Sequence, residues 1–220
     1  MKIAIDGPAG SGKSSVSRLV AQRLGFTYVD TGAMYRAVGL AAVENGLDTK
    51  NADAVSGILD GLKITLSGSA KQQIFLNERN VSEEIRLPEI SVAASNVATI
   101  PAVRLKLTEL QRELAKTCNV VMDGRDIGTY VLPDAELKIF LTASLEERAR
   151  RRYNELCEKG VETDFESVKA DMEYRDENDS SREMAPLKAA DDSITVDTTD
   201  LTVEQTVDAI CEAAASKGCE

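Results

Sequence analysis

The sequence predicts an α/β protein built on a five-stranded parallel sheet with helices on both faces. Three observations lead to this prediction: short apolar runs, a turn after each run, and helical periodicity after each turn. Residues 62–81 depart from the pattern, because apolar and polar residues alternate there as in an antiparallel hairpin. The expected parallel strands are Lys2–Asp6, Phe26–Val29, Val120–Asp123, Leu137–Leu141 and Ser193–Val196.

Helical spacing of apolar residues follows each strand or glycine-rich turn. The first helix begins at Ser14 and stops at Gly25, a residue type that commonly ends helices. Pro101 opens another helix, because proline is favoured in the first helical turn. Another helix is expected through Val38, Ala41 and Ala42 to the Asn45-Gly46 turn. Further helices are expected from Ser144 to Glu158, from Asp164 to Asp179 and from Thr202 to Ala215.

Composition bounds the domain organisation and the possible chemistry. The 220 residues fit a single domain, with a core of residues 1–60 and 101–220 and an insertion over residues 61–100. The chain has no histidine, which excludes Ser-His-Asp triads, Cys-His dyads and His-ligated zinc. Its net charge of −11 disfavours nucleic acid and anionic membrane surfaces as partners. We expect a monomer.

Cysteine usage and hydropathy indicate a cytoplasmic protein. The four cysteines form no CxxC pair, so they predict neither a zinc site nor a disulfide framework, and we expect reduced, mostly structural thiols. No run approaches 18 apolar residues, and the first residues lack the apolar core of a signal peptide, so we expect no membrane span.

Residues 7–14, GPAGSGKS, match the phosphate-loop pattern G-x-x-x-x-G-K-[ST] between a strand and a helix. Glycines allow the backbone N–H groups to turn inward around a phosphate, and the helix N-terminus favours the same anion. Lys13 would neutralise the outer phosphates, and the Ser14 hydroxyl can ligate Mg²⁺. The alternative is a glycine turn with an exposed lysine.

A phosphate loop indicates a nucleotide but not a reaction. A GTPase would carry an N-K-x-D segment, which is absent, and motor or transporter ATPases are usually longer. A small-molecule kinase remains. If its acceptor is itself a phosphate, no general base is needed, which suits a chain without histidine.

Arginines occur where two anionic substrates would need neutralisation. Arg125 lies in a DGRD turn after an apolar strand, a position without an apolar packing role. Asp123 ends the same strand, where phosphate-loop proteins place the acid that holds Mg²⁺ through water; a simple strand-end turn is the alternative. Arg36 and Arg104, taken singly, also fit solvated helix positions. Arg175, Asp179 and Arg182 have the spacing of one helix face.

The run EERARRR at residues 146–152 predicts a basic lid over about residues 150–165. Two of its arginines have glutamate partners four residues earlier, which explains them without a functional role. Arg148 and Arg152 lack such partners and are the better candidates for reaching ATP. An ordinary helical hairpin is the alternative interpretation of the same segment.

The chain resembles bacterial cytidylate kinases over nearly its whole length, in segments that keep the family's order and spacing. These segments are GPAGSGKSS, DTGAMYRA, AASNVA, VMDGRDIGT, and ERARRRYNEL followed by YRDENDSSREMAPL. The resemblance implies a three-layer P-loop kinase fold with a five-stranded parallel core, an antiparallel insertion in the monophosphate-binding region, and a mobile lid. It further implies Mg²⁺-assisted, direct in-line transfer of the γ-phosphoryl group of ATP to CMP or dCMP.

The resemblance also assigns site residues. Family members place a serine and an aspartate at the positions of Ser95 and Asp126 against the cytosine, and arginines around its ring and phosphate. Thr31 stands where some members have serine; the hydroxyl is retained, so we expect little loss. The expected ATP contacts are Gly7, Pro8, Ala9, Gly10, Ser11, Gly12, Lys13, Ser14 and Ser15, with Ser14 on Mg²⁺. The expected CMP contacts are Thr31, Arg36, Ser95, Arg104, Arg125, Asp126, Arg175, Asp179 and Arg182. The expected catalytic residues are Lys13, Arg125, Arg148 and Arg152.

Two other functions stay open at this point. The acceptor could be another monophosphate or a small hydroxyl compound such as shikimate, for which Asp30 is placed to act as base. A regulatory module that binds ATP without turnover is the second alternative, although binding alone does not require so many arginines.

Overall fold

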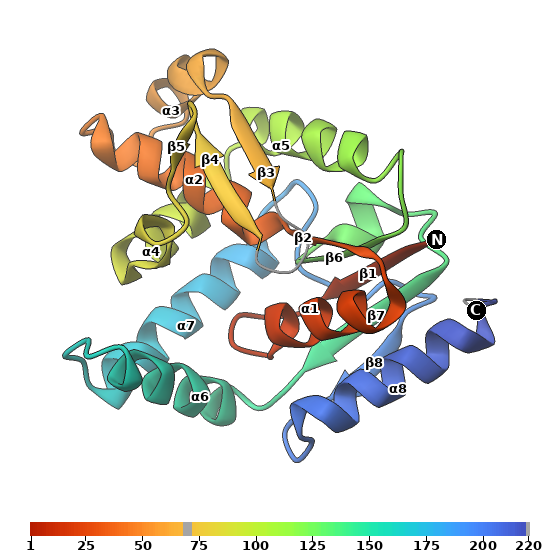
Figure 1. Cartoon of the computed structure of the whole chain (residues 1–220). Coiled ribbons are helices and arrows are strands. Elements are labelled where there is room, and N and C mark those ends of the chain that lie inside the picture. Colours follow the sequence, from red (N-terminus) through yellow and green to blue (C-terminus); the bar gives the residue numbers. More distant parts are fainter. Residues whose placement is uncertain (68–71, 219–220) are drawn as a thin grey trace.

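In the computed structural model, which describes residues 1–67 and 72–218, a parallel sheet forms the centre of the molecule (Figure 1). Its strands are β1 Lys2–Asp6, β2 Thr27–Asp30, β6 Val120–Gly124, β7 Leu137–Thr142 and β8 Ile194–Asp197. The order across the sheet is β2-β6-β1-β7-β8, and every neighbouring pair is parallel. The predicted five-stranded parallel sheet is therefore confirmed.

The register of the strands gathers polar residues at one edge of the sheet. Asp30 at the end of β2 lies opposite Asp123 in β6, and Asp6 of β1 lies opposite Gly124. Because parallel strands end at the same edge, the loops that follow β1, β2 and β6 meet there. This edge positions the site described below.

One face of the sheet is covered by α1 (Lys13–Leu24) and α8 (Val203–Ser216), which run side by side (Figure 1). Ile3 and Ile5 of β1 belong to the same buried cluster as Val20 of α1 and Ile210 of α8. The burial of these apolar side chains explains why a short strand without alternating polar residues lies at the centre of the sheet.

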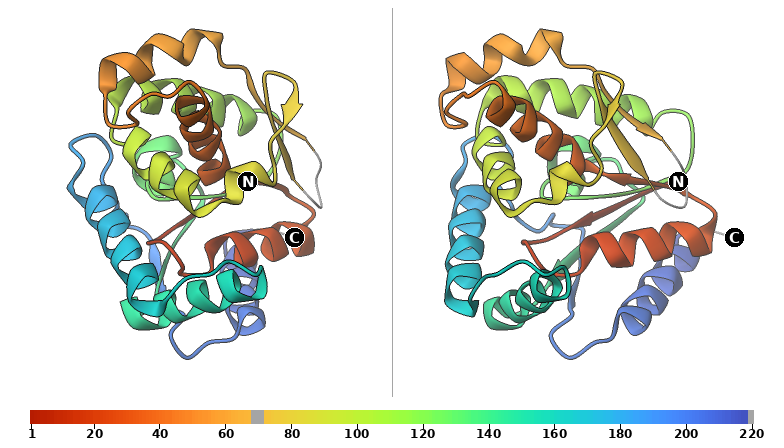
Figure 2. Two further views of the ribbon diagram at one scale, coloured as in Figure 1. Left: turned by 90° about the vertical axis from the view of Figure 1, so that its left-hand side faces the viewer. Right: turned by 60° about the vertical axis from the view of Figure 1, so that its left-hand side comes forward.

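The other side of the molecule carries α2 (Thr31–Glu44), α4 (Pro88–Val97) and α5 (Pro101–Leu114) (Figure 2). Helices α2 and α4 pack closely because Gly39 of α2 has no side chain: a Cβ there would lie 2.9 Å from the Ala94 nitrogen. The sequence did not predict α4. Its start fits the rule for proline, since Pro88 occupies the first helical turn.

The insertion combines helices with a small antiparallel sheet. It holds β3 (Ile64–Ser67), β4 (Gln73–Leu76) and β5 (Arg79–Asn80), which pair in the order β3-β4-β5, so the predicted hairpin is confirmed. The expected hairpin range also contains residues 68–71, which lie outside the described residues. A short helix that the sequence did not predict, α3 (Ala52–Ile58), precedes the insertion.

Gln72 joins the insertion to the sheet. Its side-chain oxygen accepts a hydrogen bond from the Asp30 nitrogen at 2.9 Å, and its Nε2 donates to the Tyr28 carbonyl oxygen at 2.6 Å. The amide therefore occupies the exposed edge of β2 as a neighbouring strand would.

The lid region consists of α6 (Leu145–Glu158) and α7 (Phe165–Ser181), joined by a short loop. Its apolar residues Leu156, Val168 and Met172 cluster with Ala9 of the phosphate loop. The proposed boundaries of the domain, the insertion and the lid stay predictions. One expectation is wrong: Arg182 does not share the α7 face, because it is the residue after the helix and has extended backbone angles (φ −64°, ψ 140°).

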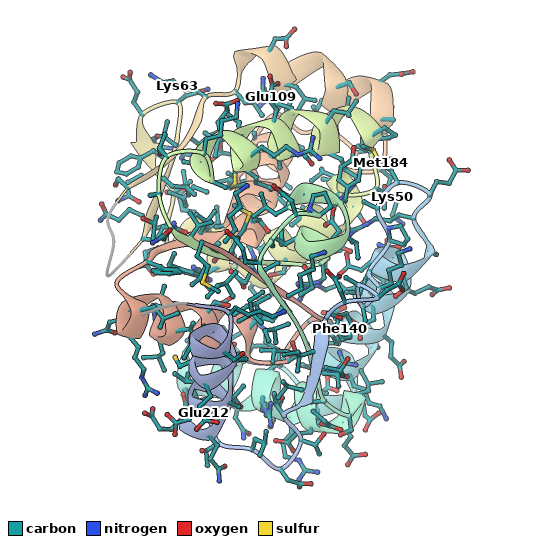
Figure 3. All side chains as sticks on the ribbon, turned by 90° about the vertical axis from the view of Figure 1, so that its right-hand side faces the viewer. Lys50, Lys63, Glu109, Phe140, Met184 and Glu212 are labelled. Atoms are coloured by element: carbon teal, nitrogen blue, oxygen red, sulfur yellow. The ribbon has the colours of Figure 1, made fainter. Side chains whose placement is uncertain are left out.

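The surface is strongly charged. Figure 3 shows charged side chains projecting outward, among them Glu109 of α5 and Glu212 of α8 at opposite ends of the molecule. Cys118 and Cys157 are exposed and form no disulfide, so the expectation of mostly structural thiols is wrong for these two; Cys219 lies outside the described residues. Within residues 1–67 and 72–218, no helix has the length and apolar character needed to cross a bilayer.

Candidate active site

The loop after β1 follows a path that requires glycine at two positions. Gly7 has φ 150°, and a Cβ there would lie 2.0 Å from the Leu141 carbonyl oxygen of β7. Gly10 has φ 72°, and a Cβ there would lie 2.7 Å from the end of Met172 in α7. Both positions therefore exclude any side chain. The alternative of an exposed lysine is wrong, because Lys13 is buried.

Lys13 folds back over its own loop. Its Nζ donates to the Pro8 carbonyl oxygen at 2.6 Å and to Ser11 Oγ at 3.3 Å. Burial, followed by repulsion from Arg125, lowers the pKa of Lys13 well below its ordinary value. The loop itself offers the Lys13 ammonium only neutral dipoles as partners. An anion bound in the loop would supply a charged partner and favour the charged form of Lys13.

Ser14 and Asp123 are brought together at the carboxyl edge of the sheet. Ser14 Oγ donates to Asp123 Oδ2 at 2.9 Å, and the Tyr28 hydroxyl donates to Asp123 Oδ1 at 3.0 Å. Burial, followed by repulsion from Asp30, raises the pKa of Asp123 to about 6. A hydroxyl beside a carboxylate suits Mg²⁺, which commonly takes one or two protein oxygens and completes its shell with phosphates and water. Ser14 and Asp123 therefore fit a magnesium ion.

A chain of buried ion pairs forms the opposite part of the site. Asp126 pairs with Arg104 and, at 3.3 Å, with Arg182. Asp179 pairs with Arg182 at 3.3 Å and with Arg125 at 2.7 Å. Arg104 is fully buried, so the alternative of a solvated helix residue is wrong for it. Each pair places charge where water is scarce, which makes its hydrogen bonds strong and its geometry well defined.

Two further arginines at this end have too little negative charge around them. Arg36 comes no nearer to a carboxylate than 3.9 Å, at Asp30, and its Nη1 has no hydrogen-bond partner. Burial, followed by repulsion from Arg125 and Arg36, lowers the pKa of Arg175 to about 10. A dianionic group bound between these guanidinium groups would relieve their repulsion.

Both ends open into one cleft with a cavity volume of about 1180 Å³. We call them the phosphate-loop end (Ala9–Ser15) and the arginine end (Arg36, Arg104, Arg125, Arg175 and Arg182). Thr31 and Ser95 also line the cleft; Thr31 Oγ1 donates to the Asp123 carbonyl oxygen at 2.7 Å. The predicted residues that line the cleft are Ala9–Ser15, Thr31, Arg36, Ser95, Arg104, Arg125, Asp126, Arg152, Arg175, Asp179 and Arg182. Gly7 and Pro8 do not line it.

The structure corrects the expectation for Arg148. This residue does not line the cleft; its Nη1 donates to the Ala9 carbonyl oxygen at 2.9 Å and to Asp176 at 2.6 Å, behind the loop. Arg148 therefore supports the loop instead of facing a ligand. Arg152 does line the cleft, and its Nη1 donates to Glu155 at 2.8 Å.

Sequence reasoning missed several residues that line the cleft. Arg151 was explained by its pairing with Glu147, yet it reaches the cleft and donates to the Thr198 carbonyl oxygen at 2.6 Å. Arg86 reaches Asp30 at 3.4 Å from the insertion. The signal for Arg86 was weak, because nothing local separates it from a surface arginine. The remaining missed residues include Arg18, Tyr28, Gln72, Leu201 and Val203.

This arrangement suits a transfer between two bound anions. Cationic side chains and a glycine loop surround one end, and guanidinium groups surround the other. Preorganised positive groups stabilise the charge that develops on a transferring phosphoryl group, and two ligands in one cleft are held in reach of each other.

Comparison with known proteins decides the family. A sequence model of the family described as cytidylate kinase matches residues 3–216. The chain belongs to the cytidylate kinase family. It is 52% identical over 213 residues to a cytidylate kinase of Carboxydothermus hydrogenoformans, with 96% of each chain covered. It is 51% identical over 216 residues to a cytidylate kinase of Thermosipho melanesiensis, with 98% of this chain and 97% of the relative covered. The protein is therefore a kinase, and the alternative of a binding-only module is wrong.

Solved structures at low identity support the fold of this cytidylate kinase family member. A shikimate kinase from Bacteroides thetaiotaomicron superposes with a TM-score of 0.51 at 12% identity, covering 98% of both chains. An uncharacterised protein from Eubacterium ventriosum superposes with a TM-score of 0.52 at 14% identity, covering 98% of this chain and 99% of the other. The predicted P-loop kinase fold is confirmed.

Proposed function

We propose that the protein transfers the γ-phosphoryl group of ATP to CMP or dCMP, giving ADP and CDP or dCDP. The observation that carries this proposal is the single cleft, which joins a phosphate loop to a buried cluster of arginines and carboxylates. Membership in the cytidylate kinase family supplies the donor class and the acceptor base. Composition and periodicity contain no signal for cytosine.

ATP occupies the phosphate-loop end. Backbone N–H groups of the loop and the start of α1 cradle the phosphates, Lys13 neutralises them, and Arg152 approaches from the lid. Ser14 would ligate Mg²⁺ directly and Asp123 through water. When bound, the metal would neutralise charge on the donor phosphates.

CMP occupies the arginine end. Ser95, Arg104 and Asp126 offer donors and acceptors to the edge of the base. Asp179 and Arg182 lie beside the sugar. The phosphate lies among Thr31, Arg36, Arg125 and Arg175, the group that contains the incompletely paired guanidiniums.

The chemistry needs no general base. An oxygen of the CMP phosphate, already an anion, attacks the γ-phosphorus, and the bond to the oxygen bridging the β- and γ-phosphates breaks. ADP leaves with that oxygen and its electron pair. Lys13, Arg125 and Arg152 are the side chains placed to hold the charge that spreads over the transferred group.

A hydroxyl acceptor is disfavoured by the surroundings of Asp30, its candidate base. The Asp30 carboxylate accepts a hydrogen bond from the Ala33 nitrogen at 2.9 Å and caps α2. It also lies 3.4 Å from Arg86 and 3.9 Å from Arg36. The Asp30 carboxylate is therefore already committed to the cap of α2 and to two guanidinium groups.

An acceptor panel tests the function. ADP release is measured with CMP, dCMP, UMP, AMP and shikimate, each with ATP and Mg²⁺. We expect turnover with CMP and dCMP and none with shikimate. As control, Lys13→Ala should lose on the order of a hundredfold in kcat while remaining folded by circular dichroism. Turnover with shikimate alone, or with none of the acceptors, would overturn the proposal.

Cellular context is part of the same proposal. We infer a cytoplasmic monomer that binds neither nucleic acid nor membranes, in keeping with its net charge of −11. The cationic side chains of the cleft outweigh this negative charge locally, and they do so only for small anionic ligands.

A further inference from the structure

The carboxylate of Asp123 is held from two sides. Ser14 Oγ donates to Oδ2 at 2.9 Å, and the Tyr28 hydroxyl donates to Oδ1 at 3.0 Å. Among residues 1–67 and 72–218, these two are the side chains that hydrogen-bond to this carboxylate. They come from different elements, since Ser14 lies on α1 and Tyr28 on β2.

Tyr28 is itself rigidly placed. Its side chain belongs to the buried cluster that contains Val16 of α1 and Val121 of β6, and the residue is 6% exposed. The ring therefore packs between α1 and the sheet, and its hydroxyl reaches Asp123 at the edge of the cleft. A tyrosine hydroxyl carries its proton at neutral pH, so the group donates to Asp123.

We propose that Tyr28 is a positioning residue for the metal ion, because its hydroxyl fixes the carboxylate of Asp123 in the orientation that faces Ser14. The inference rests on the proposed function, in which Ser14 and Asp123 hold Mg²⁺. Tyr28 itself touches neither the metal nor the nucleotide in this assignment.

The two hydrogen bonds stand in different relations to a bound cation, because Ser14 is a proposed metal ligand and Tyr28 is not. A metal ion at Ser14 would take a lone pair of its oxygen, and the hydroxyl proton would be left for Asp123, so this oxygen would be shared by both. The Tyr28 bond is on the other carboxylate oxygen and survives. It therefore restrains rotation of the carboxylate without using the Ser14 hydroxyl or the metal.

The test compares three variants with the wild type. Tyr28→Phe removes the hydroxyl and keeps the ring; Asp123→Asn removes the proposed metal-binding charge; Tyr130→Phe is the control, since Tyr130 does not line the cleft. ADP binding is measured by calorimetry over a range of Mg²⁺ concentrations and, separately, in EDTA. We expect Tyr28→Phe to raise the Mg²⁺ midpoint by about tenfold, with ADP affinity in EDTA within about twofold of wild type.

The outcomes separate this inference from the proposed function. A wild-type midpoint in Tyr28→Phe, together with a raised midpoint in Asp123→Asn, overturns the role of Tyr28 and leaves the magnesium site in place. An unshifted Asp123→Asn overturns the magnesium site itself. If Tyr28→Phe weakens ADP equally with and without Mg²⁺, Tyr28 supports the fold only and the inference is overturned.

Discussion

At the scale of the residue, Asp126 serves both the fold and the cleft. It lies between Arg104 and Arg182, and it also lines the arginine end, where we propose that it contacts the base. Removing one partner from a buried ion pair is costly because the remaining charge has no counterion. An alanine substitution would therefore change both stability and base recognition, and the two effects could not be separated. Asparagine keeps one acceptor oxygen and is the better probe.

Asp126→Asn should lower kcat/KM for CMP by more than about tenfold and leave KM for ATP within about threefold of wild type. The physical reason is that Asp126 lies at the arginine end and does not touch the phosphate loop. Steady-state kinetics with each substrate varied in turn measures both effects. Asp134→Asn, at an exposed side chain paired with Lys2, is the control. Normal CMP kinetics in Asp126→Asn would remove Asp126 from the acceptor site.

At the scale of the element, α7 and α6 are joined to the phosphate loop. Asp176 of α7 accepts hydrogen bonds from the Ala9 nitrogen at 3.3 Å and from Arg148 of α6 at 2.6 Å. Arg148 in turn donates to the Ala9 carbonyl oxygen at 2.9 Å. The position of these helices is thus coupled to the shape of the loop, which explains why Arg148 is buried instead of facing the cleft.

Asp176→Asn should raise KM for ATP by about three- to tenfold with little change in KM for CMP, because it weakens the contact between α7 and Ala9. Asp171→Asn, at an exposed position on the same helix, is the control. The measurement is the pair of Michaelis constants at saturating second substrate. Equal increases in both constants would show that α7 acts on the whole cleft and not through the loop.

At the scale of the whole molecule, buried carboxylates make stability depend on pH. Asp6 accepts hydrogen bonds from the Ile127 nitrogen at 2.8 Å and the Gly128 nitrogen at 2.7 Å. Burial nevertheless raises its pKa from 3.8 to about 7, with Asp126 adding repulsion and Lys13 opposing it. Between these two values the folded state binds more protons than the unfolded state, so stability falls as pH rises through that window.

The free energy of unfolding should therefore be higher at pH 5 than at pH 8, by at most about 1.4 kcal/mol from Asp6 for each pH unit below its folded pKa. Asp6→Asn, which cannot titrate, should flatten this dependence. Urea denaturation at pH 5, 6, 7 and 8 measures both proteins. An equal slope for wild type and variant would contradict the assignment of the pH dependence to Asp6.

Features that local interactions determine could be predicted from the sequence, and features that long-range contacts determine could not. Gly7 and Gly10 were predictable, because a phosphate loop requires a local backbone path that only glycine permits. Helices α3 and α4 were not predicted. The packing of α4, for example, depends on Gly39 in a different helix. Arg182 was misplaced because its role depends on Asp126, 56 residues away, and not on helix periodicity.

The amino-acid sequence alone was enough for the sheet, the phosphate loop and the family, because apolar runs, glycine spacing and motif order are local or linear properties. Tertiary packing decided which arginines face the cleft. Arg148 and Arg151 lie on one turn of α6, yet Arg148 points behind the loop and Arg151 lines the cleft. Packing also brought Tyr28 to Asp123. Such contacts join distant strands and helices, and their geometry exists only once the sheet has formed.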